Sequence, residues 1–301
     1  MTSILYASLS TEQANPHSRH LDRLSSRKLV ALMNREDLRV LHAVQCAQVS
    51  IARAVELITD ALREGGRLIF VGAGTSGRLG VIEAAECPPT FNTPPALIQA
   101  VMAGGAPAVF RSQEGAEDNE SAGRQAIRRA VRPGDVVVGI AASGVTPFVH
   151  AALSEAKRRR AATVLVTCHS GATPRLSLDV KIILAVGPEI LTGSTRLKSG
   201  TACKMVLNML TTASMAQLGK IYDHWMVDLQ PRSKKLVARG IRLISELGHI
   251  SEPEAQGVFR AARGRVKVAI LMARKKLSYV QAVHRLSQSQ DSLRQALNER
   301  R

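Results

Sequence analysis

The chain has 301 residues, of which 45% are hydrophobic and 22% are charged, and this composition is typical of a folded globular protein. Its length predicts one large domain with a smaller one. No apolar run reaches the roughly 18 residues that a membrane helix needs, and the polar N-terminus lacks the pattern of a signal peptide. We therefore expect a cytoplasmic protein without a membrane partner.

The cysteines and histidines indicate neither disulfides nor a metal. Four cysteines lie far apart in the sequence, at positions 46, 87, 168 and 203, and there is no Cys-x-x-Cys or His-Glu-x-x-His motif. We expect no metal site and no cofactor.

The formal net charge is +17, which raises the question of a nucleic-acid partner. Much of the excess positive charge lies in residues 231–301, which contain sixteen basic and five acidic residues. Three tyrosines and one tryptophan leave little on which bases could stack. We therefore favour a solvated basic surface over nucleic-acid binding.

The first 65 residues predict an arm followed by helices. Residues 1–20 are polar and without a period, and Ser25-Ser26 precede a short helix that includes Leu29 to Met33. A longer helix is expected from Glu36 to Glu64, where apolar residues recur at helical spacing until Gly65-Gly66 ends the run. This helix could cover the sheet or a partner subunit.

Beyond residue 65 the pattern alternates strand with helix. Expected strands are Leu68–Val71, Ala96–Met102, Asp135–Ala141, Thr163–Thr167 and Val180–Ala185. Expected helices are Arg78–Ala85, Glu120–Ala130, Phe148–Arg160 and Ser194–Leu218. Such alternation predicts an α/β fold, a five-stranded parallel sheet with helices on both faces. Four Arg-rich helices after Pro231 predict a small helical domain, so we expect divisions at 1–65, 66–230 and 231–301.

The stretch from Arg67 to Pro89 has the features of a phosphate site. A buried strand is followed by Gly74-Thr75-Ser76-Gly77 and then by a helix, which we expect to end at Glu86-Cys87-Pro88-Pro89. Glycines allow backbone N–H groups to approach an anion, and a helix N-terminus attracts one. A dinucleotide site is the alternative, but the second strand ends without the carboxylate that would hold a ribose. A second alternative is that the glycine turn only connects the strand to the helix and binds nothing.

A second loop of the same kind follows the third strand. It reads Ala142-Ser143-Gly144-Val145-Thr146, and its hydroxyls either cap the next helix or bind the same phosphate. Ligands of parallel sheets bind beyond the carboxyl ends of the strands, where both loops are expected.

Two glutamates are candidates for acid–base chemistry. Glu86 precedes two prolines, and Glu117 lies in the acidic cluster Glu114 to Asp118. A carboxylate beside a phosphate would repel it, so we expect these groups at the other end of the substrate. The alternative for the cluster is a solvated loop.

Five strings of the sequence resemble the N-acetylmuramic acid 6-phosphate etherases. They are VGAGTSGRLG, AECPPTF, EGAED, GIAASGVTPFV and GPEILTGSTRLKSGTACKMVLNML, within a similarity that spans roughly Leu9 to Leu247. The last string is shared mainly with this family and the related glucokinase regulatory proteins. The sequence departs from the family pattern at Ala85, where the family commonly has serine.

The resemblance implies a sugar isomerase-type sheet, a ubiquitin-associated-like C-terminal domain and a homodimer. It also implies cleavage of the D-lactyl ether of N-acetylmuramic acid 6-phosphate to N-acetylglucosamine 6-phosphate and D-lactate, in amino-sugar recycling from the cell wall. By motif match Glu86 is the proton donor and Glu117 the second active-site acid, which we assign as the base. The runner-up function is a regulatory protein that binds sugar phosphates.

Overall fold

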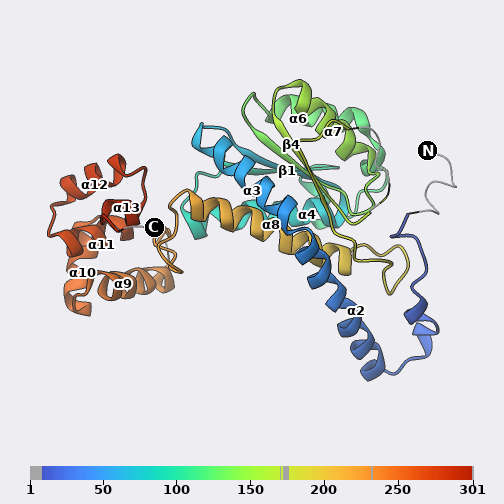
Figure 1. The fold of residues 1–301 in the computed structure, drawn as a ribbon, viewed down its shortest axis with the longest axis horizontal. Helices are drawn as coiled ribbons and strands as arrows, with labels where there is room; N and C mark the ends of the chain where they lie inside the picture. The colour runs from blue at the N-terminus through green and yellow to red at the C-terminus, as the bar shows by residue number, and fades with distance from the viewer. Residues whose placement is uncertain (1–8, 170, 172–175, 232, 300–301) are drawn as a thin grey trace. The chain divides into compact units, whose positions relative to one another are not determined.

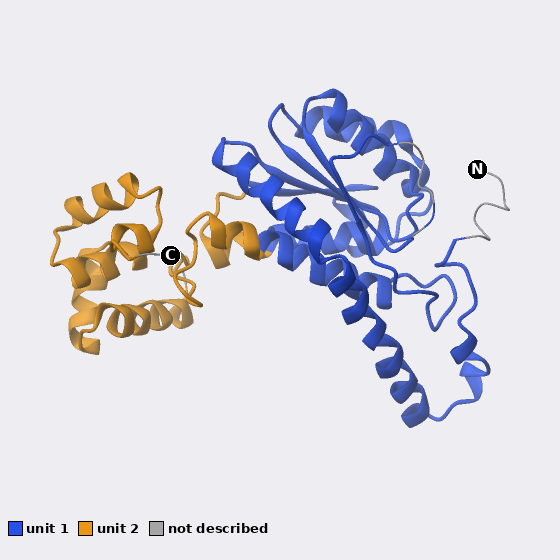
Figure 2. Cartoon of the chain, viewed as in Figure 1, with its two compact units in different colours: residues 1–85, 96–211 blue, residues 86–95, 212–301 orange. Residues whose placement is uncertain are grey.

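The computed structural model describes residues 9–169, 171, 176–231 and 233–299. The chain divides into two compact units, which Figure 2 colours separately. Unit 1 consists of the residues before 86 together with 96–211, and unit 2 consists of 86–95 and the residues from 212 onward.

The helices and strands follow the order shown in Figure 1. They are η1 (Pro16–Ser18), η2 (Leu21–Arg23), α2 (Ser26–Cys46), α3 (Gln48–Arg63), β1 (Leu68–Gly72), α4 (Gly74–Phe91), β2 (Ile98–Met102), α5 (Pro107–Phe110), η3 (Ala116–Asp118), α6 (Glu120–Ala130), β3 (Val136–Ile140), α7 (Pro147–Arg158), β4 (Ala162–Thr167), β5 (Val180–Ile183), α8 (Lys198–Gln217), α9 (Lys234–Gly248), α10 (Glu252–Ala261), α11 (Val266–Lys275), α12 (Tyr279–Gln288) and α13 (Leu293–Ala296).

The sheet of unit 1 confirms the expected fold class. Its five strands are all parallel, in the order β2-β1-β3-β4-β5, and β1 and β3 are buried along their whole length. Ile69, Val137 and Leu165 pack against helices α6 and α7 on one face. Figure 1 shows α3, α4 and α8 on the other face. Such burial on both faces accounts for the continuous apolar runs in the sequence.

The expectation of one long helix over residues 36–64 is wrong. Helix α2 already begins after the Ser25 cap and ends at Cys46, and α3 follows directly from Ala47. The Ser50 hydroxyl donates to the Ala47 carbonyl at 2.8 Å, where α3 begins. No glycine or proline lies at this break, so the residue types do not reveal it.

Helix α4 also differs from the expectation, because it continues through Pro88 and Pro89 to Phe91. The prolines cannot donate to the carbonyls of the preceding turn. The Asn92 N–H, however, bonds to the Pro88 carbonyl at 3.0 Å and closes the last turn. Asn92 has φ +55°, and this left-handed residue ends the helix.

The end of the chain forms the expected small helical bundle. Leu243, Ile244, Val268 and Leu271 belong to its buried core. Helices α10 and α12 each begin with a capping box, built by Ser251 with Glu254 and by Ser278 with Gln281. Its likeness to a ubiquitin-associated domain stays a prediction.

The described residues contain neither a membrane-spanning helix nor a cluster of metal ligands. None of their helices is long and apolar enough to cross a membrane. Within the same residues, no group of three or more histidine, cysteine or acidic side chains is placed to hold a metal ion.

A buried ion pair joins α2 to the start of α8 in unit 1. The Lys198 ammonium donates to Glu36 at 2.6 Å, and both side chains are at most 3% exposed. Asn15 and His17 also contact the Glu36 carboxylate, at 2.7 and 2.9 Å. Burial alone would raise the pKa of Glu36, but these three partners together lower it to about 2.

The lowered pKa makes part of the folding stability depend on pH. The carboxylate is charged in the folded chain at pH values where the unfolded chain, with an ordinary pKa of 4.5, already takes up a proton. The stabilisation is complete above pH 4.5 and is lost as the pH falls toward 2. A shift of this size corresponds to roughly 3 kcal/mol.

We predict that Lys198→Met lowers the free energy of unfolding by about 3 to 5 kcal/mol, because it leaves a buried carboxylate unpaired. Urea denaturation at neutral pH measures this. The matched control is Arg39→Met, which removes a half-exposed partner of Glu36 at 3.5 Å and should cost about 1 kcal/mol or less. Equal losses in the two variants would contradict the assigned role of Lys198.

Candidate functional site

The site begins where β1 meets α4, and two glycines allow the backbones to touch there. A Cβ on Gly77 would lie 2.7 Å from the Gly72 carbonyl oxygen and 2.8 Å from Met102 Cγ. A Cβ on Gly72 would lie 2.6 Å from the Gly77 nitrogen. The two contacts with backbone atoms are too short for any side chain at either position. These glycines are therefore required by packing, whatever the loop binds.

Helix α4 begins one turn earlier than expected, so Thr75 and Ser76 lie in its first turn. Gly74 opens the helix with φ +53°, and no acidic residue lies in the first turn. The Gly77 N–H bonds to the Ala73 carbonyl at 3.1 Å. The N–H groups before it, at the head of the helix, are those that an intrahelical ladder leaves without acceptors. They suit an anion.

The second loop lies beside the first. Strands β1 and β3 are neighbours, and Gly72 pairs in register with Ile140, so their carboxyl ends coincide. Beyond Ile140, the Val145 N–H donates to the Ser143 hydroxyl at 3.4 Å, and Gly144 has φ +78°. Thr146 is the N-cap of α7, yet its side chain makes no capping hydrogen bond. The two loops thus meet at the switch point of the sheet.

The buried side chain of His150 adds no positive charge to this edge of the sheet. His150, on α7, is 9% exposed, and its Nε2 finds no hydrogen-bond partner among the described residues. Burial lowers the pKa of His150, although a backbone hydrogen bond with Gly144 and the charge of Glu120 act in the opposite direction. The ring is therefore neutral at neutral pH.

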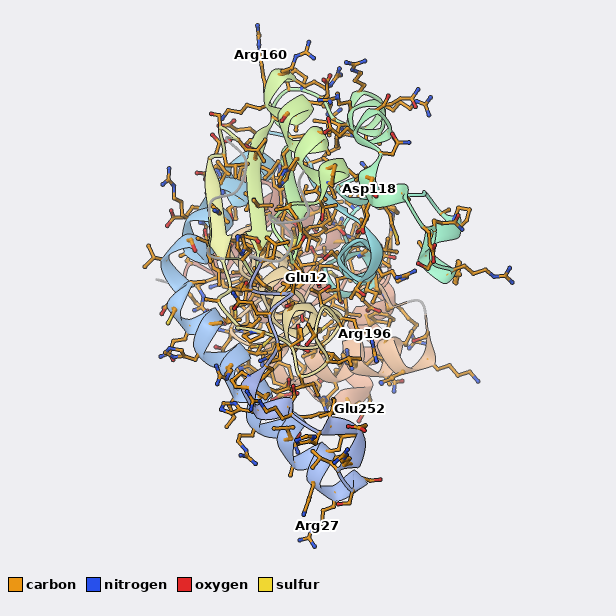
Figure 3. The ribbon with its side chains drawn as sticks, turned by 90° about the vertical axis from the view of Figure 1, so that its right-hand side faces the viewer. Glu12, Arg27, Asp118, Arg160, Arg196 and Glu252 are labelled. Carbon is orange, nitrogen blue, oxygen red and sulfur yellow. The ribbon has the colours of Figure 1, made fainter. Side chains whose placement is uncertain are left out.

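A cavity of about 240 Å³ opens at the head of α4. Its lining includes Gly74, Arg78, Glu114 and Glu117. In Figure 3, Asp118 marks the turn that carries Glu117, and Arg160 lies at the opposite, amino end of the strands. The cavity thus brings one predicted acid to the predicted phosphate loop.

Arg78 shapes this cavity without binding an acid there. Its guanidinium donates to the carbonyls of Ala108 and Val109, at 2.8 and 2.9 Å. These bonds tie the chain after β2 to α4, and this is the chain that leads on to Glu117. Arg78 is therefore a positioning residue that the sequence alone did not single out.

The other predicted residues lie outside this cavity lining as far as the described residues define it. Thr75, Ser76 and Gly77 follow Gly74 on α4, and the hydroxyl loop of Ser143, Gly144 and Thr146 follows the neighbouring strand. Glu86 is exposed, on α4 within unit 2. The structure thus brings Glu117 to one cavity with Gly74, while the roles of both glutamates and of the predicted phosphate loops stay predictions.

Sequence reasoning also missed the group that orders the start of α8. Glu189 is fully buried and accepts from the N–H groups of Lys198 and Ser199, at 3.0 and 2.8 Å, so it caps this helix. A Cβ on Gly200 would lie 3.6 Å from Thr75 Cγ2, which places the start of α8 beside the first loop. An acid inside an apolar, glycine-rich segment was the available signal.

The fold and the paired loops define a sugar isomerase (SIS) domain protein. Residues 50–157 match the glucokinase regulatory protein N-terminal SIS domain, and residues 116–213 match the SIS domain. A phosphoheptose isomerase from Francisella tularensis has the same fold. It aligns with a TM-score of 0.52 and 16% identity, over 64% of this chain and 100% of that one.

The family follows from relatives that span nearly the whole chain. An N-acetylmuramic acid 6-phosphate etherase from Gloeothece citriformis is 48% identical and covers 96% of this chain and 95% of its own length. One from Geobacillus thermodenitrificans is 46% identical over 96% of this chain and 98% of its own length. The chain belongs to the N-acetylmuramic acid 6-phosphate etherase family.

We predict that Ser76→Ala weakens the binding of N-acetylglucosamine 6-phosphate by roughly tenfold or more, because one charge-assisted hydrogen bond contributes about 1.5 to 3 kcal/mol. Isothermal titration calorimetry measures the Kd. Ser121→Ala, at an exposed position of α6, is the matched control and should bind like the unaltered chain. An unchanged Kd for Ser76→Ala would move the phosphate elsewhere.

Proposed function

We propose that the chain acts as an N-acetylmuramic acid 6-phosphate etherase, a carbon–oxygen lyase on a phosphorylated amino sugar. The observation that carries this proposal is that Gly74, at the head of α4, and Glu117 line one cavity, within a chain that matches etherases along almost its full length. The products are N-acetylglucosamine 6-phosphate and D-lactate.

Elimination is the reaction that suits two carboxyl groups. When the sugar ring opens, the aldehyde at C1 acidifies the C2 proton, and a base can remove it. The lactyl oxygen then leaves C3 with a proton from an acid, and water adds to the C2–C3 double bond. We assign Glu117 as the base and Glu86 as the acid, each contributing roughly 10²- to 10⁴-fold.

The charges around the cavity agree with this assignment. The phosphate is held by N–H groups, by the hydroxyls of Thr75, Ser76, Ser143 and Thr146, and by the partial positive charge at the head of α4. Gly77 and Gly144 have no side chain, so the backbone can approach the phosphate closely there. Glu117 lines the same cavity as Gly74, and in this proposal its carboxylate acts at the sugar carbons rather than at the phosphate.

Glu86 is too far along α4 to serve the phosphate loop of its own chain. It follows Ser76 by ten residues, and a helix rises roughly 1.5 Å per residue, so about 15 Å separate them along the axis. Phosphorus and C3 of a hexose 6-phosphate are five covalent bonds of about 1.5 Å apart, which gives at most about 7 Å. We therefore propose that Glu86 acts in the site of a second copy of the chain.

The exposed surface of α4 fits such a homodimer. Ile82 is 54% exposed and lies one turn before Glu86, on the same side of the helix. Further large apolar side chains are exposed on α2 and α3, namely Val30, Leu38, Leu41 and Val49. A second copy that covers α4 would bury Ile82 and receive Glu86.

A regulatory protein that binds sugar phosphates is the second candidate function, since residues 50–157 match a domain of the glucokinase regulatory protein. The enzyme is favoured because Glu86 and Glu117 are both present and the full-length relatives are etherases. We place the reaction in the cytoplasm, where phosphorylated sugars are made.

We predict that Glu86→Gln and Glu117→Gln each lower kcat for D-lactate release by about 10²-fold or more with little change in KM, because each removes a proton-transfer group. Glu120→Gln is the matched control, since Glu120 is exposed and pairs with Arg124. Near-normal kcat in either variant would refute that residue's role.

Mixing the two inactive variants tests the shared site. A mixed dimer holds one site in which both glutamates are intact, so random exchange should restore about a quarter of normal activity. Light scattering should report a dimer at micromolar concentration. A monomer, or a mixture that stays inactive after subunit exchange, would contradict the shared site while leaving the etherase activity itself untouched.

A further inference from the structure

A second cavity, of about 430 Å³, lies within unit 2. Its charged lining consists of Lys220, Asp228, Arg263, Arg265, Lys267 and Asp291, which come from the segment before α9 and from both sides of α11. It shares no lining residue with the cavity of Glu117. Its size is that of a small-molecule site, for which about 300 to 1,000 Å³ is usual.

Two lysines and two aspartates form a fixed network in the wall. Lys267 is 4% exposed and donates to the carboxylate and the carbonyl of Asp291, both at 2.7 Å, and it lies 3.2 Å from Asp228. Lys220 contacts the same aspartates and lies 2.7 Å from Asp228 and 3.6 Å from Asp291. The four charges cancel, and the network holds the cavity in shape.

The two arginines keep their charge for a ligand. Arg263 is exposed, and its guanidinium lies 4.7 Å from the centre of the Tyr279 ring. Among the described residues, neither Arg263 nor Arg265 forms an ion pair with an acidic side chain. The lining therefore has a net charge of +2, and an anion is the ligand that it favours.

The backbone adds donors to the arginines. Val266, Lys267 and Val268 line the cavity, begin α11 and are at most 4% exposed, and Arg265 provides no side-chain cap for their N–H groups. Buried donors without acceptors cost free energy, which a bound anion would recover. Guanidinium groups beside N–H groups suit the tetrahedral oxygens of a phosphate.

Two amide side chains belong to the lining. Gln230 donates to the Asn92 side-chain oxygen at 2.6 Å, and this bond uses neither the Asn92 NH₂ nor the Gln230 oxygen. A donor beside an acceptor suits a hydroxyl group. We propose that this cavity binds a small phosphate monoester that carries hydroxyl groups, at a site separate from the etherase site.

The single tryptophan of the chain lies in a segment that contributes to this cavity, and it serves as the probe. Trp225 lies between Lys220 and Asp228 in the sequence and pairs with Tyr222 through its backbone. Titration of the full chain with glycerol 3-phosphate, at constant ionic strength, should give a saturable change in tryptophan fluorescence. Inorganic phosphate should bind more weakly, because it lacks the hydroxyl groups.

Variants decide whether the signal comes from this cavity. Arg265→Gln should raise the Kd at least roughly tenfold, and Arg260→Gln, an exposed arginine of α10 outside the lining, should leave it unchanged. Ser76→Ala should also leave this Kd unchanged, which separates the proposal from the etherase site. The proposal is overturned if chloride gives the same change, if no saturable change occurs, or if Arg265→Gln binds normally.

Discussion

The close approach of two backbones at the end of β1 is the constraint on which the site depends. Gly72 and Gly77 touch with no room for a Cβ on either, so α4 begins directly against the strand end. The head of α4 is thereby fixed beside β3, whose loop carries Ser143. One steric requirement thus places a helix N-terminus, two hydroxyl loops and the cavity of Glu117 at one edge of the sheet.

Buried charges away from the cavity hold the same edge in place. Glu189 caps α8, and Lys198, at the first position of that helix, pairs with Glu36 of α2. Gly200, two residues after Lys198, lies beside Thr75, so the same helix start that carries this pair also contacts the loop after β1. Folding stability and the shape of the site are therefore set by the same few residues.

The sequence predicted the sheet well because its strands are buried on both faces, and such burial leaves continuous apolar runs. The prediction of helix bounds failed at two places where tertiary contacts determine the structure. One is Ala47, between α2 and α3, and the other is Pro88, beyond which α4 continues to the buried Phe91 and ends at the Asn92 turn. Glu117 could be found from its motif. Arg78 and Glu189 could not be assigned roles, since each binds backbone groups, which residue types do not reveal.

The path of oxygen from water tests the proposed elimination most directly, since it reports which bond breaks. In heavy-oxygen water, elimination from C3 followed by water addition places the label in the C3 hydroxyl of N-acetylglucosamine 6-phosphate and leaves the lactate hydroxyl unlabelled. Mass spectrometry of both products reads the outcome. Label in the lactate hydroxyl would mean displacement at the lactyl carbon, and would contradict the roles given to Glu86 and Glu117.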